Sequence, residues 1–367
     1  MHKKAILITI GIIFFAVVVK VGFSLGNFFP VASRVLFHRA QALKSTNGRT
    51  SILLLGTGGA NHDGPNLTDT MIYATIDTTK NTVTLISIPR DLWMPDLAQK
   101  INFAYAKGEA SGQHKGLLLA KAEVAHVLGQ PVDYGFRIDF SGFVKAIDLV
   151  GGLDIQVQNT LDDYQYPIDG KESDPCGHTD EEIQAFAASA SATADMTFFP
   201  CRFKHLHFDA GMQHMDGQTA LEFVRSRHGV GSEGSDFARS RRQQLVIEAF
   251  RGKVFSAQTI FNPGKIIGLY TILQQSIDTD VMQEEFTLFL DLAQKVQHAK
   301  ITSYVLDYGD DATGRAGLLI NPPIDAAYNF ASVLIPRIGD GNYSEIQTFV
   351  ACEIQKGNCI VSANSGK

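Results

Sequence analysis

Hydrophobic and polar positions along the middle of the chain predict strands and helices in turn. Residues 51–57, SILLLGT, form an almost wholly apolar run followed by glycines, which is typical of a strand buried on both faces. We expect further strands over residues 70–77, 82–89, 134–139, 153–158 and 301–306. We expect helices over residues 115–128, 141–150, 218–227, 235–250, 263–275 and 282–296. This order predicts an α/β fold with a mixed β-sheet and helices packed on it.

Two segments do not follow this pattern. Residues 160–205 are polar and predict an irregular insert in a domain spanning 50–307, with one helix of small residues near 181–194. Residues 308–367 are expected to form a C-terminal extension, with an added helix and strand after Asn321.

The amino end predicts a membrane anchor. Lys3 and Lys4 precede an apolar run, and a second apolar run follows Lys20. A cleaved signal peptide is the rival, but Ser24-Leu25-Gly26 is a poor cleavage site, so a retained anchor is favoured. We therefore expect a cytoplasmic tip and N-terminal transmembrane helix within 1–29, and a juxtamembrane linker over 30–49. By the positive-inside rule, the chain is then a single-pass protein of the cell membrane with its C-terminal domain extracytoplasmic.

Composition and cysteines agree with an exported globular domain. The 367 residues are 45% hydrophobic with a net charge of −6, which argues against general nucleic-acid binding. Two local disulfides, Cys176–Cys201 and Cys352–Cys359, are the preferred pairing, with free thiols as the alternative. No CxxC spacing supports metal binding by these cysteines.

The most unusual stretch is residues 223–250, where arginines flank a Gly/Ser loop between two predicted helices. These are Arg225, Arg227, Arg239, Arg241 and Arg242. At 100° per residue, Arg239, Arg242 and Gln243 share a helix face with the apolar Val246 and Phe250. An unpaired buried guanidinium is costly, so this pattern favours a pocket for an anion such as phosphate. A solvated basic helix is the alternative, and it explains Arg241 better.

Other polar residues lie at predicted strand ends, where α/β proteins bind ligands. These segments are residues 61–69 and Arg90-Asp91, and neither carries the Gly-Lys-Ser/Thr of a P-loop. His205, His207, His214 and His228 lack the HxxxH or HExxH spacing of helical metal sites. We therefore expect these four histidines to be solvated or structural.

Several ordered motifs resemble one family. They are LLLG at 53–56, TDTMI at 68–72, SIPRD at 87–91, KINFAY at 100–105, DFSGFVKAIDLVGGLDIQV from Asp139, MDGQTALEFVRSRH from Met215 and SDFARSRRQQ from Ser235. Together they resemble the LytR-CpsA-Psr proteins, over about residues 51–255 and on to about 307. The resemblance implies a three-layer α-β-α sandwich around the mixed sheet.

The resemblance also implies an activity and a site. Family members are Mg²⁺-dependent phosphotransferases that move a glycopolymer from a polyprenyl-pyrophosphate carrier to peptidoglycan in the cell wall, with the lipid chain in an apolar tunnel. The pyrophosphate would be bound by Arg90, Arg225, Arg227, Arg239, Arg242 and Gln243. Catalysis would rest on Arg90, Asp91, Arg239 and Arg242, the metal on Asp69, and support of the site on Asp236.

Some roles stay open at this point. Asp69 or Asp91 could accept the proton of the attacking hydroxyl, but bracing of Arg90 is the favoured role for Asp91, and helix capping for Asp236. Thr57 and Asn66-Leu67-Thr68 stand where many members have an aspartate and an arginine. This departure motivates two alternatives, a non-catalytic binding or sensor protein for polyprenyl phosphate or an anionic glycan, and a pyrophosphatase acting on the same lipid.

Overall fold

The structure is a computed structural model that describes residues 42–59, 64–112, 114–171, 173–189, 195–254, 256–260, 262–296, 298–310, 315–357 and 359–361. These residues fall into two compact units. The smaller unit contains the short helix η4 (Gln283–Glu285) and the helix α11 (Phe286–Lys295). The larger unit, Ser45–Asp280 with Val296–Lys367, contains every feature discussed below.

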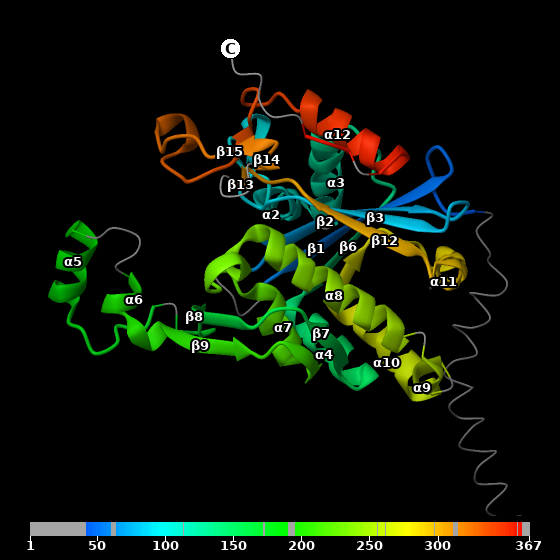
Figure 1. Cartoon of the computed structure of the whole chain (residues 1–367), viewed down its shortest axis with the longest axis horizontal. Coiled ribbons are helices and arrows are strands. Elements are labelled where there is room, and N and C mark those ends of the chain that lie inside the picture. The colour runs from blue at the N-terminus through cyan, green and yellow to red at the C-terminus, as the bar shows by residue number, and fades with distance from the viewer. Residues whose placement is uncertain are drawn as a thin grey trace, which may run out of the picture. The chain divides into compact units, whose positions relative to one another are not determined.

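A six-stranded mixed sheet forms the centre of the larger unit (Figure 1). Its strands, in spatial order, are β11 (Ile277–Thr279), β6 (Tyr134–Asp139), β1 (Arg49–Thr57), β2 (Thr68–Asp77), β3 (Thr82–Ser87) and β12 (Lys300–Val305). The pairs β1–β6 and β3–β12 are parallel, and the other pairs are antiparallel. The apolar run at 51–57 is therefore an inner strand, as its composition predicted.

Helices cover both faces of this sheet (Figure 1). One face carries α2 (Phe103–Ala110), α3 (Lys115–Leu128) and α12 (Ser344–Gln355), and the opposite face carries α4 (Phe140–Val150), α7 (Gly217–Arg225), α8 (Asp236–Val254) and α10 (Pro263–Ser276), with the short α9 (Ala257–Ile260) after α8. The buried apolar residues form two hydrophobic cores. Leu53, Leu55 and Ile86 of the sheet belong to one core, and Ile147 and Phe223 belong to the other. The predicted α/β fold with a mixed sheet is confirmed.

Local sequence signals fix the ends of these helices. The carboxylate of Asp139 accepts a hydrogen bond from the Gly142 amide at 2.8 Å and caps α4. Asp216 caps α7 in the same way through the Thr219 amide, also at 2.8 Å. Gly129 ends α3 with a φ of 62°, a left-handed conformation that glycine adopts without strain.

The expectation of an irregular insert at 160–205 was wrong in part. This region contains β8 (Leu161–Pro167), which pairs with β9 (Phe203–Phe208), and between them lie α5 (Asp180–Ser189), α6 (Asp195–Phe198) and η2 (Pro200–Arg202). Leu161, Tyr166, Leu206 and Phe208 are buried on one side of the hairpin. Charged residues and histidines occupy the other side, so apolar positions are too sparse for the sequence to indicate strands.

The remaining short elements border these layers. The strand β7 (Leu153–Val157) pairs with β10 (Gly211–Met215), outside the six-stranded sheet. The others are β4 (Trp93–Met94), η1 (Pro95–Leu97), β5 (Gln99–Lys100), η3 (Gly231–Gly234), β13 (Gly309–Asp310), β14 (Arg315–Ala316), β15 (Leu319–Ile320), η5 (Ala326–Tyr328) and β16 (Ile335–Pro336). The helix and strand expected after Asn321 correspond to α12 and β16.

Both expected disulfides are present. Cys176–Cys201 closes the excursion between β8 and β9, and Cys352–Cys359 joins α12 to the segment that follows it. Within the described ranges, no helix has both the length and the apolar character needed to cross a membrane. The predicted anchor at 1–29 and the linker up to residue 41 lie outside the described residues.

Candidate functional site

A cavity of about 220 Å³ lies where β2, α4, β8 and the facing ends of α7 and α8 come together. It is lined by Asp69, Thr70, Arg90, Phe140, Asp163, Tyr166, Pro167, Val224, Arg225, Arg227, His228, Arg239 and Gln243. A smaller hollow shares Asp69, Arg90 and Arg239 with it. Four arginines predicted from three separate sequence segments thus surround one cavity.

Arg90 follows β3 and is held by acidic neighbours. Its Nη1 is hydrogen-bonded to Asp69 Oδ1, and Asp91 Oδ2 lies 3.5 Å from its buried Nε. The other oxygen of Asp91 accepts a hydrogen bond of 2.7 Å from Lys100 Nζ. Partial burial acts to raise the pKa of Asp91, but the Lys100 hydrogen bond and the charges of Arg90, Lys100 and Arg227 bring it below its ordinary value. This geometry is that of a brace for Arg90.

Arg225 ends α7 and is oriented by two kinds of contact. Its Nη1 and Nη2 donate to the two oxygens of Asp169, each at 3.0 Å. Its guanidinium also lies 4.4 Å from the centre of the Phe140 ring, where the face of the ring attracts a cation. Arg225 is therefore held in a fixed position along one wall of the cavity.

Arg227 is the least compensated cation of the cavity. Burial, followed by the charges of Arg239 and Arg90, lowers the pKa of Arg227 to about 10, so the group remains protonated at neutral pH. Its guanidinium makes no hydrogen bond or ion pair with any residue that the structure describes. A positive group held among like charges is stabilised by an anion placed between them.

Asp163 of β8 holds the backbone that carries Arg227. Its carboxylate is 1% exposed, and Oδ2 accepts hydrogen bonds from the Ser226 hydroxyl at 2.7 Å and the amides of Arg227 and His228 at 3.3 and 3.2 Å. Its Oδ1 accepts from the Gln165 amide at 2.9 Å. Asp163 was not predicted because β8 was not predicted, and the sequence pattern does not show that this carboxylate is buried.

Arg242 does not reach the cavity, contrary to the prediction that it binds pyrophosphate directly. Its side chain is 3% exposed and donates to the carbonyls of Phe223, Ser226 and Glu233 at 2.9, 2.7 and 3.0 Å. Its Nη1 also pairs with Glu233 Oε2 at 3.1 Å. Adjacent helical positions point about 100° apart, so Gln243 faces the cavity while Arg242 faces α7. Arg242 thereby ties the end of α7 to η3.

The other predicted residues of α8 also fall into two groups, those that line the cavity and those at the start of the helix. Arg239 and Gln243, one turn apart, both line the cavity, and Gln243 Nε2 lies 3.4 Å from Thr70 Oγ1. The hydroxyl of Ser235 accepts a hydrogen bond from the Ala238 amide at 3.2 Å and caps α8. Asp236 is the first residue of α8, and its side chain lies outside the described residues.

The oxygen donors of the cavity are compatible with one magnesium ion. Asp69 Oδ1 is engaged by Arg90, whereas Oδ2 has no hydrogen bond or ion pair among the described residues. Magnesium binds through one or two carboxylates and retains phosphate and water ligands. Both oxygens of Asp163 are already occupied by N–H and O–H donors, which leaves Asp69 as the carboxylate that fits. Thr57, at the position of the family's aspartate, is fully buried and its Oγ1 has no partner among the described residues.

Comparison with known proteins identifies the family of this chain. The sequence model of the LytR_cpsA_psr family matches residues 32–319. The chain belongs to this family. The match extends beyond the boundaries 51–307 that the motifs alone had indicated.

Two relatives with assigned activities are similar in sequence. The polyisoprenyl-teichoic acid–peptidoglycan teichoic acid transferase TagU of Bacillus cereus is 27% identical over 241 residues, covering 64% of this chain and 61% of that protein. The corresponding transferase TagV of Bacillus subtilis is 28% identical over 204 residues, covering 54% and 41%. The chain thus spans less than two thirds of either relative.

Solved structures show the same fold. Protein gbs0355 from Streptococcus agalactiae has a TM-score of 0.54 at 21% identity, covering 88% of this chain and 90% of that one. Bacillus subtilis TagV has a TM-score of 0.51 at 22% identity, covering 83% and 97%. A mixed α/β fold around a central sheet is common to this chain and these proteins.

Proposed function

We propose that this protein is a glycopolymer phosphotransferase that moves a glycan from a polyprenyl-pyrophosphate carrier onto peptidoglycan. Membership of the family and the transferase activity of the named relatives support this proposal. The observation that carries it is the convergence of Arg90, Arg225, Arg227 and Arg239 on one cavity. A mildly acidic protein has no general reason to gather these cations, and a diphosphate supplies the matching charge.

The size of the cavity suits the headgroup of such a carrier. Pockets that enclose drug-sized ligands measure about 300–1,000 Å³, and this cavity is about 220 Å³. It therefore accommodates a diphosphate and adjoining atoms, but not a whole polyprenyl chain. Phe140 and Val224 add apolar surface to its wall, where the first carbons of the lipid would lie.

The reaction forms one P–O bond and breaks another. The acceptor hydroxyl oxygen attacks the phosphorus that carries the glycan, and the bond from that phosphorus to the bridging oxygen breaks. Polyprenyl monophosphate leaves, the glycan becomes joined to peptidoglycan through a phosphodiester, and the hydroxyl proton passes to a base. Asp69 lines the cavity, and Asp91 braces Arg90 from behind.

The arginines stabilise the charge that develops during this displacement. Negative charge grows on the equatorial oxygens and on the departing phosphate, and preorganised guanidinium groups stabilise both. Arg225 is already held by Asp169, and Arg90 by Asp69 and Asp91, so their forks need little rearrangement. Arg227, without such a partner, gains most from the phosphate.

Magnesium is part of the proposal. Asp69 Oδ2 would hold the ion together with phosphate oxygens and water, and the ion would neutralise charge on the diphosphate. We further propose that the protein is anchored by its amino-terminal apolar run with its catalytic domain outside the cytoplasm. The two disulfides support this location, since such bonds persist in oxidising compartments.

Transfer of a labelled glycan from its polyprenyl-pyrophosphate carrier to peptidoglycan, with magnesium, tests the proposal. Arg227→Met should reduce product formation by about a hundredfold or more. The substitution removes a guanidinium that would donate hydrogen bonds to the negative charge developing on the phosphate oxygens. Arg241→Met is the matched control, since Arg241 lies on α8 outside the cavity, and it should keep wild-type activity. Equal product from both variants would contradict the mechanism.

The same experiment separates the two alternatives. Tight lipid binding without product over long incubation would indicate a binding or sensor protein. The motivating observation is the buried Thr57 Oγ1, at the family's aspartate position, which has no partner among the residues that the structure describes. Release of phosphate products in the absence of peptidoglycan would indicate a pyrophosphatase.

A further inference from the structure

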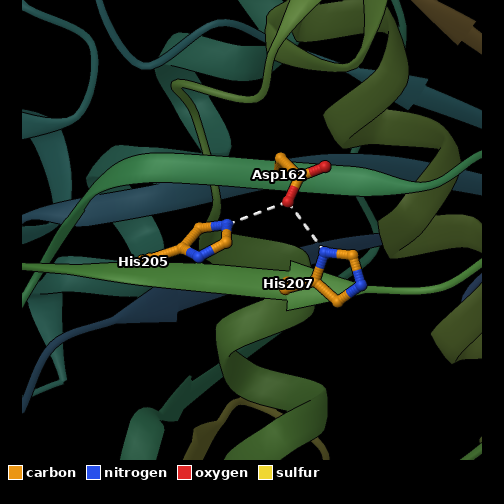
Figure 2. Close-up of side chains that lie close together, drawn as sticks. All are labelled: Asp162, His205 and His207. Carbon is orange, nitrogen blue, oxygen red and sulfur yellow. Dashed lines mark hydrogen bonds and ion pairs between the residues drawn. The ribbon is translucent and has the colours of Figure 1, made fainter.

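Three side chains of the β8–β9 hairpin lie close together (Figure 2), and none of them lines the arginine cavity. Asp162 comes from β8 and lies opposite His207 of β9, and His205 is two residues before His207 on the same strand. Asp162 Oδ1 lies 2.8 Å from His205 Nε2 and 2.7 Å from His207 Nδ1. Residues two apart on a strand point to the same side, which is why a His-x-His pair can meet one carboxylate here.

Hydrogen bonding by neutral histidines does not fully account for this cluster. His207 contacts Asp162 through Nδ1 and also lies 3.2 Å from Asp209 Oδ1 through Nε2. A neutral imidazole has one N–H, so only one of these two contacts to a carboxylate can be a donated hydrogen bond. The other nitrogen then faces a carboxylate oxygen with its lone pair. Either a second proton or a cation shared by Nδ1 and Asp162 resolves this conflict.

We propose that Asp162, His205 and His207 form a binding site for a first-row divalent transition metal, with zinc as the best match. Two imidazole nitrogens and one carboxylate oxygen, with water as a fourth ligand, suit tetrahedral zinc. The ligand atoms lie within 4.8 Å of one another, and a tetrahedral site with bonds of about 2.0–2.1 Å separates its ligands by roughly 3.3 Å. Small side-chain rotations therefore open the space for the ion.

The surroundings of the cluster fit metal binding in two further ways. Asp209 would accept the Nε2 proton of His207, which is the usual outer partner of a metal-bound histidine. The Tyr164 ring stacks on the His205 ring with centroids 4.1 Å apart and planes 6° apart, which fixes the direction of that ligand. The three side chains are 29–45% exposed, so an ion can enter from solvent.

The location gives the ion a structural effect. The register of β8 and β9 shifts just after Asp163, so the pairing is interrupted beside the cluster. The Asp162 carbonyl accepts a hydrogen bond of 2.8 Å from the Val230 amide, and the side chain of Asp163 holds Ser226, Arg227 and His228. A metal that fastens β8 to β9 at Asp162 therefore also steadies the backbone carrying Arg227.

Calorimetric titration with zinc chloride tests the site on the full chain, freed of its affinity tag and treated with chelator. The wild-type protein should bind about one equivalent, and zinc should raise its unfolding temperature. His205→Ala, His207→Ala and Asp162→Asn should each weaken binding by about tenfold or more and abolish the thermal shift. Cobalt should give the visible absorption of a four-coordinate site in the wild-type protein but not in these three variants.

His214→Ala is the matched control. His214 Nδ1 lies 2.7 Å from Asp154 Oδ1, so it repeats one exposed His–Asp contact without a second histidine. This variant should bind zinc as the wild type does. Circular dichroism of the metal-free variants confirms that they fold, and Asp162→Asn provides a substitution of equal size should either alanine variant misfold.

Two results would overturn the proposal. Zinc that fails to bind the wild-type protein would identify the cluster as two histidines that are only hydrogen-bonded to Asp162. Zinc that binds equally well after His207→Ala would place the ion elsewhere. Neither outcome affects the proposed transferase activity, because the cluster lies outside the arginine cavity.

Discussion

Substitution of Arg242 and of Arg227 should have different effects on stability although both are arginines of the same stretch. Arg242 is 3% exposed and donates to three carbonyls and to the buried Glu233 carboxylate. Arg227 has no such partner among the described residues and sits near the positive charges of Arg239 and Arg90. Arg242→Met should therefore destabilise the protein, whereas Arg227→Met should leave its stability unchanged or increase it.

The magnitude for Arg242 follows from the partners that the substitution leaves behind. Removing one member of a buried ion pair costs about 3–5 kcal/mol, because the other charge remains buried without compensation. Little of this is screened by solvent, since the Glu233 side chain is only 11% exposed. Burial of the methionine side chain offsets about 1 kcal/mol. A net loss of about 3 kcal/mol corresponds to a fall in Tm of about 5–10 °C.

A second substitution measures the cost of leaving the Glu233 carboxylate buried without Arg242. Glu233→Gln in the Arg242→Met background should recover about 1–2 kcal/mol, because a neutral amide is less costly to bury and can still accept from Asn159. Thermal unfolding followed by circular dichroism measures all four proteins, and transfer assays run beside it. Both single variants should lose activity, Arg227→Met through lost charge and Arg242→Met through a disturbed 226–230 loop.

Two results would contradict these predictions. An Arg242→Met protein that unfolds at the wild-type temperature would mean that the guanidinium is not the tie between α7 and η3. A strongly destabilised Arg227→Met protein would mean that Arg227 has structural partners.

Three further predictions concern the supports of the site. Asp163→Asn should destabilise by about 2–4 kcal/mol, since an amide group replaces an acceptor of several donors, and amide hydrogen exchange should rise in residues 226–230; unchanged protection there would contradict the role of Asp163. The pKa of Asp91 is lowered in the folded protein, so its stabilising effect is present above the unfolded value and is lost as pH falls through the folded one. Lys100→Met should therefore lower Tm at neutral pH, and this difference should close as pH falls through the folded pKa of Asp91; a difference in Tm that stays constant with pH would refute it. Reduction of Cys176–Cys201, which closes a loop worth about 3 kcal/mol by chain entropy, should expose residues 177–200 to protease while the transfer activity persists; unchanged cleavage would show that the bond does not restrain the excursion.

The regular parts of the fold were predictable because short-range signals agree with tertiary packing. The helix expected at 115–128 has those bounds in the structure, since its apolar spacing and Gly129 indicate the same end. The strands expected at 134–139 and 301–306 were also found, the latter at Lys300–Val305. Each of these segments has enough apolar residues to show the periodicity of its helix or strand.

The hairpin of β8 and β9 was not predictable in the same way. Its outward positions carry Asp162, His205 and His207, and its inward positions include the buried Asp163. A test for helical histidine spacing could not detect a pair two residues apart on an unrecognised strand. For this reason, neither the candidate metal site nor the role of Asp163 in holding residues 226–230 was predicted.

The site residues were predicted as a group but not in their individual roles. Arginines from three segments do meet at one cavity, as the motifs implied. The helical projection put Arg242 beside Arg239 and could not show that α7 and η3 offer it carbonyl groups. Which face of a helix meets a ligand depends on the packing of distant segments, and that information is not local to the sequence.

The affinity of the full chain for a short polyprenyl pyrophosphate, measured by calorimetry, tests the central claim most directly. Arg227→Met should weaken binding by about tenfold or more, equivalent to at least about 1.4 kcal/mol, while Arg241→Met should bind as the wild type does. Wild-type affinity in the Arg227→Met protein would contradict the claim that these converging guanidinium groups bind the diphosphate.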